Sequence, residues 1–245
     1  MQKQERIEQV LEIIKTRKFC TVEQLVQELH YSPATIRRDL THLAQRGLIE
    51  KSYGGASYIG MWTLTVREHH QTSAKTKLCQ ATADLVRDGD AVFVDGTSTI
   101  YFLRDILLKK KNLQVVTTNL KLALDLGENN VTCFLPGGRL CDTAMLGGPL
   151  AAETLQRFSF NVAFFSPGWV THEGAFQIPE VFWESAATVL KNSQRKVCLY
   201  LKEKLVPQRL CCFGHLDTFD TVISDAEYPA AFQTDFPDTE FVLVK

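Results

Sequence analysis

The sequence has no long hydrophobic run and no secretion signal. No apolar stretch approaches the roughly 20 residues that a helix needs to span a bilayer. The N-terminal stretch MQKQERIEQVLEIIKTRKF is charged and periodic, without the apolar segment of a signal peptide. We therefore expect a cytoplasmic chain with no membrane partner.

The cysteines lack the spacing of a metal site or a redox motif. None of the seven forms a CxxC pair, and no Cys/His cluster has zinc-ligand spacing. His69 and His70 are expected to be solvated. We predict no metal, no cofactor, and buried free thiols in a reducing compartment. Redox sensing by the adjacent pair Cys211 and Cys212 stays open.

The net charge of −1 also excludes a strongly basic chain. Residues 1–60 carry nine Lys or Arg and seven Asp or Glu, a net charge of +2, and the remainder carries −3. This asymmetry is slight. A DNA-binding protein can nevertheless be near neutral overall and basic on one helix.

Three short helices and a hairpin are predicted in the first sixty residues. Apolar spacing predicts a helix over 4–17. Thr21, with Gln24 three residues on, fits a capping box for a second helix that ends near residue 30. Ser32 and Pro33 begin a third helix that Gly47 closes. Two strand-like runs around Gly54 and Gly55 follow. Together these elements predict a winged helix-turn-helix.

Such a domain places its third helix in the major groove of DNA. Arg37 and Arg38 lie on that helix and can donate to phosphates or to guanine. The alternative is that the two arginines form only a solvated helix face. Ser32 lies at the helix start, where backbone amides favour a phosphate. Lys51 and Tyr53 would lie on the wing, near the DNA backbone.

The stretch YSPATIRRDLTHLAQRGLIEKSYGGA, which contains Ser32 to Ala56, resembles the DNA-binding signature of the DeoR family of transcription regulators. The resemblance implies that Thr35, Arg37 and Arg38 contact DNA. It also implies that Asp39 positions an arginine instead of touching DNA. The full set of predicted DNA-binding residues is Thr21, Ser32, Thr35, Arg37, Arg38, Lys51 and Tyr53.

The remainder of the chain alternates strands and helices. We predict domains over 1–58 and 75–245, with a linker over 59–74. A helix is expected over 75–87 and another over 98–110, with further helical stretches around 119–126, 148–157 and 180–193. Seven apolar segments predict strands: 91–95, 113–117, 131–135, 161–166, 196–201, 221–225 and 241–245. This alternation predicts an α/β domain with a mostly parallel sheet, covered on both faces.

Small polar turns follow four of these strands. Such sheets bind ligands at the carboxyl ends of their strands, and Gly, Ser and Thr turns there can hold a phosphate. The alternative is that these residues serve only turn geometry. The four turns are 95–99, 118–119, 136–139 and 166–168.

This region resembles the DeoR sensor domain, whose fold is shared with ribose-5-phosphate isomerase and CoA transferases. The matching pieces are Lys75, VFVDGTSTIYFL, VVTTNL, PGGRL, LGGPLAAETL and GWVTHEG. The resemblance implies a sugar phosphate or related metabolite as the effector, with its phosphate at the loop from Asp95 to Thr99. The predicted effector-binding residues are Lys75, Asp95, Gly96, Thr97, Ser98, Thr99, Thr118, Asn119, Gly137, Gly138, Ser166, Gly168 and Lys204.

The sequence departs from the family pattern at Leu120, Val170, Ala186 and Leu201, so about half of the polar pocket looks altered. Whether this pocket still binds a ligand stays open. Lys204, or Lys202 beside it, is a candidate phosphate partner or equally a solvated turn.

Three hypotheses follow. The leading one is a DNA-binding regulator, most often a repressor in this family, of a carbohydrate-metabolism operon, not an enzyme. It would bind double-stranded operator DNA as a homo-oligomer, a dimer or tetramer. In the second, the sensor domain serves only oligomerisation. The third is an isomerase-like enzyme, with Asp95 and Lys204 in catalytic roles.

Overall fold

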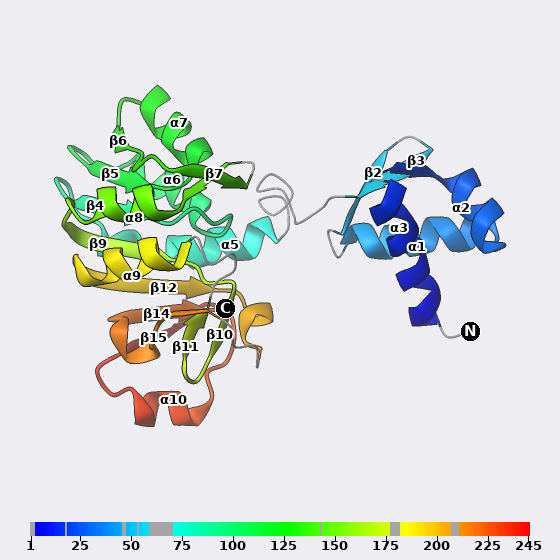
Figure 1. Cartoon of the computed structure of the whole chain (residues 1–245). Helices are drawn as coiled ribbons and strands as arrows, with labels where there is room; N and C mark the ends of the chain where they lie inside the picture. Colours follow the sequence, from blue (N-terminus) through cyan, green and yellow to red (C-terminus); the bar gives the residue numbers. More distant parts are fainter. Residues whose placement is uncertain are drawn as a thin grey trace. The chain divides into compact units, whose positions relative to one another are not determined.

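The computed structural model describes residues 3–17, 19–45, 48–52, 54–58, 71–142, 144–176, 182–206 and 211–245. Contacts divide the chain into two compact units, Met1–His70 and Gln71–Lys245, called here the N-terminal and C-terminal units (Figure 1). Most of the predicted linker and the predicted helix end at Gly47 lie outside the described residues. Within those residues, no helix is both long and apolar enough to cross a membrane.

The N-terminal unit has the predicted three helices. They are α1 (Lys3–Arg17), α2 (Val22–Leu29) and α3 (Pro33–Gln45). The predicted capping box at the start of α2 is confirmed. The Gln24 amide donates to Thr21 Oγ1 at 3.1 Å, and the Thr21 amide donates to Gln24 Oε1 at 2.9 Å. Helix α2 ends at His30, which adopts a left-handed conformation with φ of 56°.

A three-stranded antiparallel sheet completes the N-terminal unit. The predicted hairpin is present as β2 (Ile49–Ser52) and β3 (Gly55–Tyr58). A short strand that was not predicted, β1 (Phe19–Thr21), pairs with β3. Apolar residues from all three helices and the sheet form one core: Ile7, Val10, Ile14, Cys20, Val22, Leu25, Ile36, Leu40, Leu43, Ile49 and Ala56.

The C-terminal unit is built on seven parallel strands. In chain order they are β4 (Ala91–Val94), β5 (Gln114–Thr117), β6 (Thr132–Phe134), β9 (Phe160–Phe165), β12 (Ser193–Tyr200), β14 (Thr221–Ser224) and β15 (Glu240–Leu243). Each falls within or overlaps one predicted strand, so the predicted parallel sheet is confirmed.

The order of the strands creates a switch point. In space the strands run β15-β14-β12-β9-β4-β5-β6. The chain starts at β4, moves outward through β5 and β6, and then returns to the other side of β4 at β9. The connection that follows β4 therefore runs toward one edge of the sheet, and the connection that follows β9 runs toward the other edge. Open α/β sheets bind ligands at such a point, outside the carboxyl ends of the strands.

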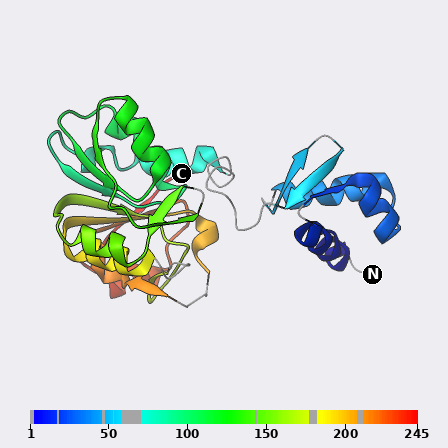
Figure 2. The same ribbon diagram turned by 45° about the horizontal axis from the view of Figure 1, so that its top comes forward.

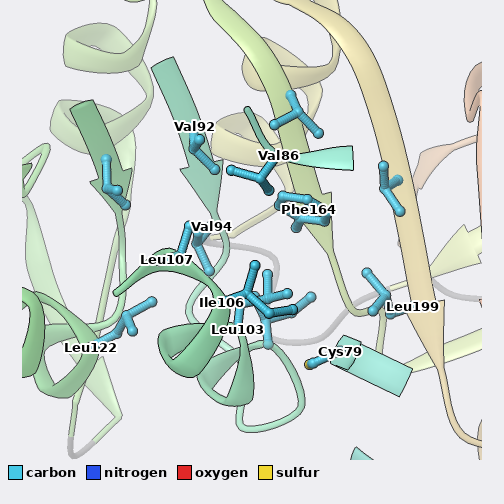
Figure 3. Packing of buried hydrophobic residues seen from close by; sticks show 14 of the residues in the cluster. Cys79, Val86, Val92, Val94, Leu103, Ile106, Leu107, Leu122, Phe164 and Leu199 are labelled. Atoms are coloured by element: carbon cyan, nitrogen blue, oxygen red, sulfur yellow. The ribbon is translucent and has the colours of Figure 1, made fainter. Parts of the chain in front are cut away.

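Helices cover both faces of the sheet (Figures 1 and 2). One face packs against α5 (Thr72–Gln80), α6 (Arg104–Leu107) and α7 (Leu120–Glu128). The other face packs against α8 (Pro149–Leu155), α9 (Trp183–Lys191) and α10 (Ala230–Asp235). Figure 3 shows the first face, where Val92, Val94 and Phe164 meet Leu103, Ile106 and Leu107. Successive residues of a strand point to opposite faces, so Phe93 belongs to the second core.

Two predicted helices are shorter than expected. The helix predicted over 75–87 begins earlier and ends at Gln80, followed by a 3-10 turn, Ala83–Leu85. The helix predicted over 98–110 is a 3-10 turn, Ile100–Leu103, joined to the one-turn α6. The prediction of one long helix was wrong in both places. The apolar residues of these two segments pack on the sheet equally well from a tight turn or from a regular helix.

In the described part of the C-terminal unit, five short strands were not predicted. β7 (Arg139–Asp142) and β8 (Met145–Gly147) form a hairpin. β10 (Trp169–Thr171), β11 (Gly174–Phe176) and β13 (Cys212–Gly214) form a small antiparallel sheet. These segments of three or four residues are too short for the period-2 pattern that identifies a strand.

Candidate functional site

The start of α3 is fixed by Ser32. The Ser32 hydroxyl accepts from the Thr35 amide at 3.2 Å and lies 2.9 Å from the Thr35 hydroxyl. Ser32 therefore caps the helix, as the sequence predicts. With that cap in place, Ile36 and Leu40 are buried in the core, while Arg37 and Arg38 are exposed on the opposite side.

Asp39 does hold an arginine, and the partner is Arg6 of α1. Arg6 donates to both carboxylate oxygens of Asp39, at 2.6 and 2.9 Å, and its guanidinium lies 5.2 Å from the centre of the Tyr31 ring. Only 1% of the Asp39 side chain is exposed. The hydrogen bond to Asp39 raises the pKa of Arg6, so the guanidinium stays charged. This bidentate ion pair joins α3 to α1 next to the exposed Arg37 and Arg38.

The wing contributes one exposed cation next to α3. Lys51 of β2 donates to the Thr41 hydroxyl of α3 at 3.0 Å. This contact brings the ammonium group beside α3. Thr21 is occupied by its capping box. Tyr53 lies outside the described residues.

A cavity in the C-terminal unit opens at the switch point of the sheet. With its mouth it has a volume of about 420 Å³. Five of the predicted effector-binding residues line it: Asp95, Gly96, Thr97, Thr118 and Ser166. They follow β4, β5 and β9, so the ends of three neighbouring strands meet in one wall.

Asp95 ties that wall together. Its Oδ1 accepts from the Thr97 amide at 2.9 Å and from the Thr97 hydroxyl at 2.7 Å, and its Oδ2 accepts from the Ser166 amide at 2.5 Å. The last bond joins the end of β4 to the end of β9, across the switch point. A carboxylate with three donors holds the loop in shape. This geometry favours a positioning role over that of a catalytic base.

Four other predicted residues lie behind the wall and do not line the described cavity. Lys75 is buried and donates to the Ser98 hydroxyl at 3.2 Å. The Thr99 carbonyl accepts from the Cys79 thiol. Asn119 caps α7 by accepting from Leu122 and also donates to the Gly96 carbonyl at 3.3 Å. These contacts therefore support the cavity wall from the protein interior. The residues that make them are Lys75, Ser98, Thr99 and Asn119.

The remaining predicted residues lie elsewhere. Gly138 has a φ of +104°, and a Cβ there would lie 2.6 Å from the Gly147 carbonyl oxygen. Gly137 is also left-handed. The amide of Gly168, directly before β10, donates to the carbonyl of Phe176 at the end of β11. Lys204 is half-buried in a 3-10 turn. None of the four lines the described cavity.

Of the four departures from the family pattern, Ala186 alone lines the described cavity. Val170 and Leu201 are buried in the two cores. Leu120 begins α7 and donates its amide to Ala144. Of the four expected departures, only the one on α9 therefore lies at the described cavity.

The sequence did not reveal the apolar side of the cavity. It is lined by Phe93, Met145, Phe165, Phe182, Ala186 and Phe213, with the polar Ser185 among them. The aromatic residues come from strands and segments far apart in the sequence, so no local motif contains them. Asp95 is the only charged side chain among the described residues that line the cavity. Among all described residues, no group of three His, Cys, Asp or Glu side chains is placed to hold a metal ion.

Comparison with known proteins identifies both units. Residues 6–60 match the family described as "DeoR-like helix-turn-helix domain", and residues 70–226 match the "DeoR C terminal sensor domain". An HTH-type transcriptional regulator, GlpR, of Haloferax volcanii is 30% identical over 92% of this chain and 91% of its own. The glycerol-3-phosphate regulon repressor of Escherichia coli is 27% identical over 94% of each chain. The lactose phosphotransferase system repressor of Lactococcus lactis is 26% identical over 92% of each.

Among solved structures, ribose 5-phosphate isomerase A from Neisseria gonorrhoeae is a partial match. Its TM-score is 0.41 and its identity 17%, over 56% of this chain and 54% of the isomerase chain. This chain thus spans about half the length of the isomerase. The relatives' names describe transcriptional regulators and not enzymes.

Proposed function

The chain belongs to the DeoR family of transcriptional regulators, and we propose that it represses a carbohydrate-metabolism operon under the control of a small effector. In this proposal α3 binds operator DNA, and a phosphorylated sugar in the cavity at the switch point weakens that binding. The observation that carries the proposal is the exposed pair Arg37 and Arg38 on α3. The residue that follows them, Asp39, is hydrogen-bonded to Arg6 of α1.

The proposed DNA interface centres on the N-terminal half of α3. Arg37 and Arg38 donate to base edges or phosphates, and Thr35 and the amides near Ser32 lie at the helix start, where a phosphate is favoured. Lys51 adds a contact from the wing to the DNA backbone. The Arg6–Asp39 pair supports this arrangement because it fixes the rotation of α3 about its axis.

The proposed effector site is the cavity at the ends of β4, β5 and β9. Thr118 and Ser166 line it and carry hydroxyls that can donate to a phosphate, while Asp95 holds the loop that carries Gly96 and Thr97. The aromatic side suits the apolar C–H face of a sugar. The names of two relatives, regulators of glycerol-3-phosphate and lactose phosphotransferase genes, support a phosphorylated carbohydrate.

Coupling between the two sites follows from linkage. The effector lowers operator affinity if it binds better to the conformation that binds DNA poorly. We propose that the chain acts as a homo-oligomer in the cytoplasm, where its DNA lies, since paired half-sites need paired helices.

The DNA interface is tested by measuring the affinity of full-length variants for DNA from upstream of the operon. If Arg37 or Arg38 contacts a guanine, its change to Ala costs about 1–3 kcal/mol and relaxes one base position. If it contacts phosphate, all sequences weaken alike and the salt slope falls by about one. Arg17→Ala is the control, because Arg17 is an exposed arginine of the same unit that pairs with Glu28. Unchanged affinity in both α3 variants contradicts the assignment.

A further inference from the structure

Two buried hydroxyls in the C-terminal unit have no hydrogen-bond partner among the described residues, that of Tyr200 in β12 and that of Ser185 in α9, and of the two only Ser185 lines the described cavity. Ser185 is only 4% exposed and lines the cavity at the switch point. A buried hydroxyl left unpaired costs about 1–3 kcal/mol, so such a group calls for an explanation.

Serine and threonine in a helix ordinarily satisfy their hydroxyl on the carbonyl four residues back. Four threonines of this chain do so: Thr16, Thr41, Thr76 and Thr154. Ser193, just beyond α9, does the same with Val189 at 2.6 Å. Ser185 makes no such bond, and its side chain forms part of the cavity wall instead.

Among the described residues that line the cavity, those beside Ser185 on the α9 side are apolar. Its neighbours along the wall are Phe182 and Ala186, and Phe213 and Phe165 also line the cavity. The predicted polar residues Asp95 and Thr118 come from the strand ends. Ser185 is thus the single polar residue that α9 contributes to this cavity among the described residues.

We infer that Ser185 determines which effector the cavity binds, by hydrogen-bonding a hydroxyl group of that molecule. This inference rests on the proposed effector pocket. Serine can both donate to and accept from such a group. The aromatic neighbours exclude water and pack against the apolar face of the same molecule. A compound without a hydroxyl at that point would leave Ser185 buried and unpaired, and would bind more weakly.

The test compares Ser185→Ala with Ser193→Ala in the full chain. Without any added compound, Ser185→Ala unfolds at the same temperature as wild type or higher, because it removes an unpaired hydroxyl. Ser193→Ala unfolds at a lower temperature, because it removes a hydroxyl that is bonded outside the cavity. The probes are glycerol 3-phosphate, ribose 5-phosphate and fructose 6-phosphate, titrated into the complex of each protein with upstream DNA.

The expected result concerns the concentration of probe that releases half of the DNA. For a probe that releases the wild type, Ser185→Ala needs about two- to tenfold more, the loss expected for one hydrogen bond. Ser193→Ala needs the wild-type concentration. If Ser185→Ala responds like wild type, or is destabilised like Ser193→Ala, the inference is overturned while the effector pocket stands. If none of the probes releases the wild type, the proposed effector class fails and the inference with it.

Discussion

The ion pair between Arg6 and Asp39 is expected to hold the DNA-binding helix in place. The structure gives Asp39 two hydrogen bonds from Arg6 at 2.6 and 2.9 Å and leaves the Asp39 side chain only 1% exposed. Arg6→Met removes both donors and leaves a buried carboxylate. Breaking a buried pair in this way costs about 3–5 kcal/mol. The Arg6 side chain is 18% exposed and water can reach it, so we expect about 3 kcal/mol, the lower end of that range.

Two further variants separate this effect from a general loss of packing. The double variant Arg6→Met with Asp39→Leu replaces the pair by apolar groups and should recover most of the stability. Arg17→Met breaks the exposed pair with Glu28, whose side chains are 47% and 38% exposed, and should cost less than about 1 kcal/mol.

Hydrogen exchange of the α3 amides in the full chain measures the opening free energy of this unit. Arg6→Met should also weaken operator binding, because Arg37 and Arg38 lose their fixed position. A loss of stability below about 0.5 kcal/mol in Arg6→Met would refute the reasoning, since surface substitutions already span that range.

Two more outcomes follow from the C-terminal unit. Gly96→Ala adds a Cβ at 2.9 Å from Met145 Cε and 3.0 Å from Thr118 Oγ1; it should cost about 1–3 kcal/mol in thermal unfolding and weaken effector-driven DNA release. Burial raises the pKa of the Cys79 and Cys198 thiols, so both should resist alkylation near pH 8 until the chain is unfolded, and rapid labelling of the native protein would contradict their burial. The folded chain keeps these two thiol protons after the unfolded chain has released them, so the free energy of unfolding should fall as pH rises above about 8.5.

The sequence predicts the framework of this protein well because its strong patterns are local. In α3, Ile36, Leu40 and Leu43 recur at helical spacing, and Ser32 supplies a cap. The sequence therefore predicts both where this helix begins and which of its sides is buried. In the sheet, four of the apolar runs end in a small polar turn. Asp95 and Ser166 are therefore predicted at strand ends, and the strand order brings them to one cavity.

What the sequence does not reveal depends on the packing of distant segments. Phe93 and Phe165 belong to fully buried strands, where no polar alternation indicates which face a side chain joins. Phe213 and Met145 belong to short strands that exist only through their pairing with β11 and β7. Whether Lys75 lies in the cavity or behind it depends on its contact with Ser98, which no spacing indicates. The boundaries of the two predicted domains stay predictions.

The central claim is that one chain binds operator DNA and releases it on binding a sugar phosphate. Electrophoretic shift of the upstream region of its operon, titrated with sugar phosphates, tests that claim most directly. We predict a shifted band that one phosphorylated sugar releases at a concentration where its unphosphorylated form does not. A shift that no sugar phosphate releases would contradict the sensing half and favour a C-terminal unit that serves only assembly. No shift at all would contradict the account.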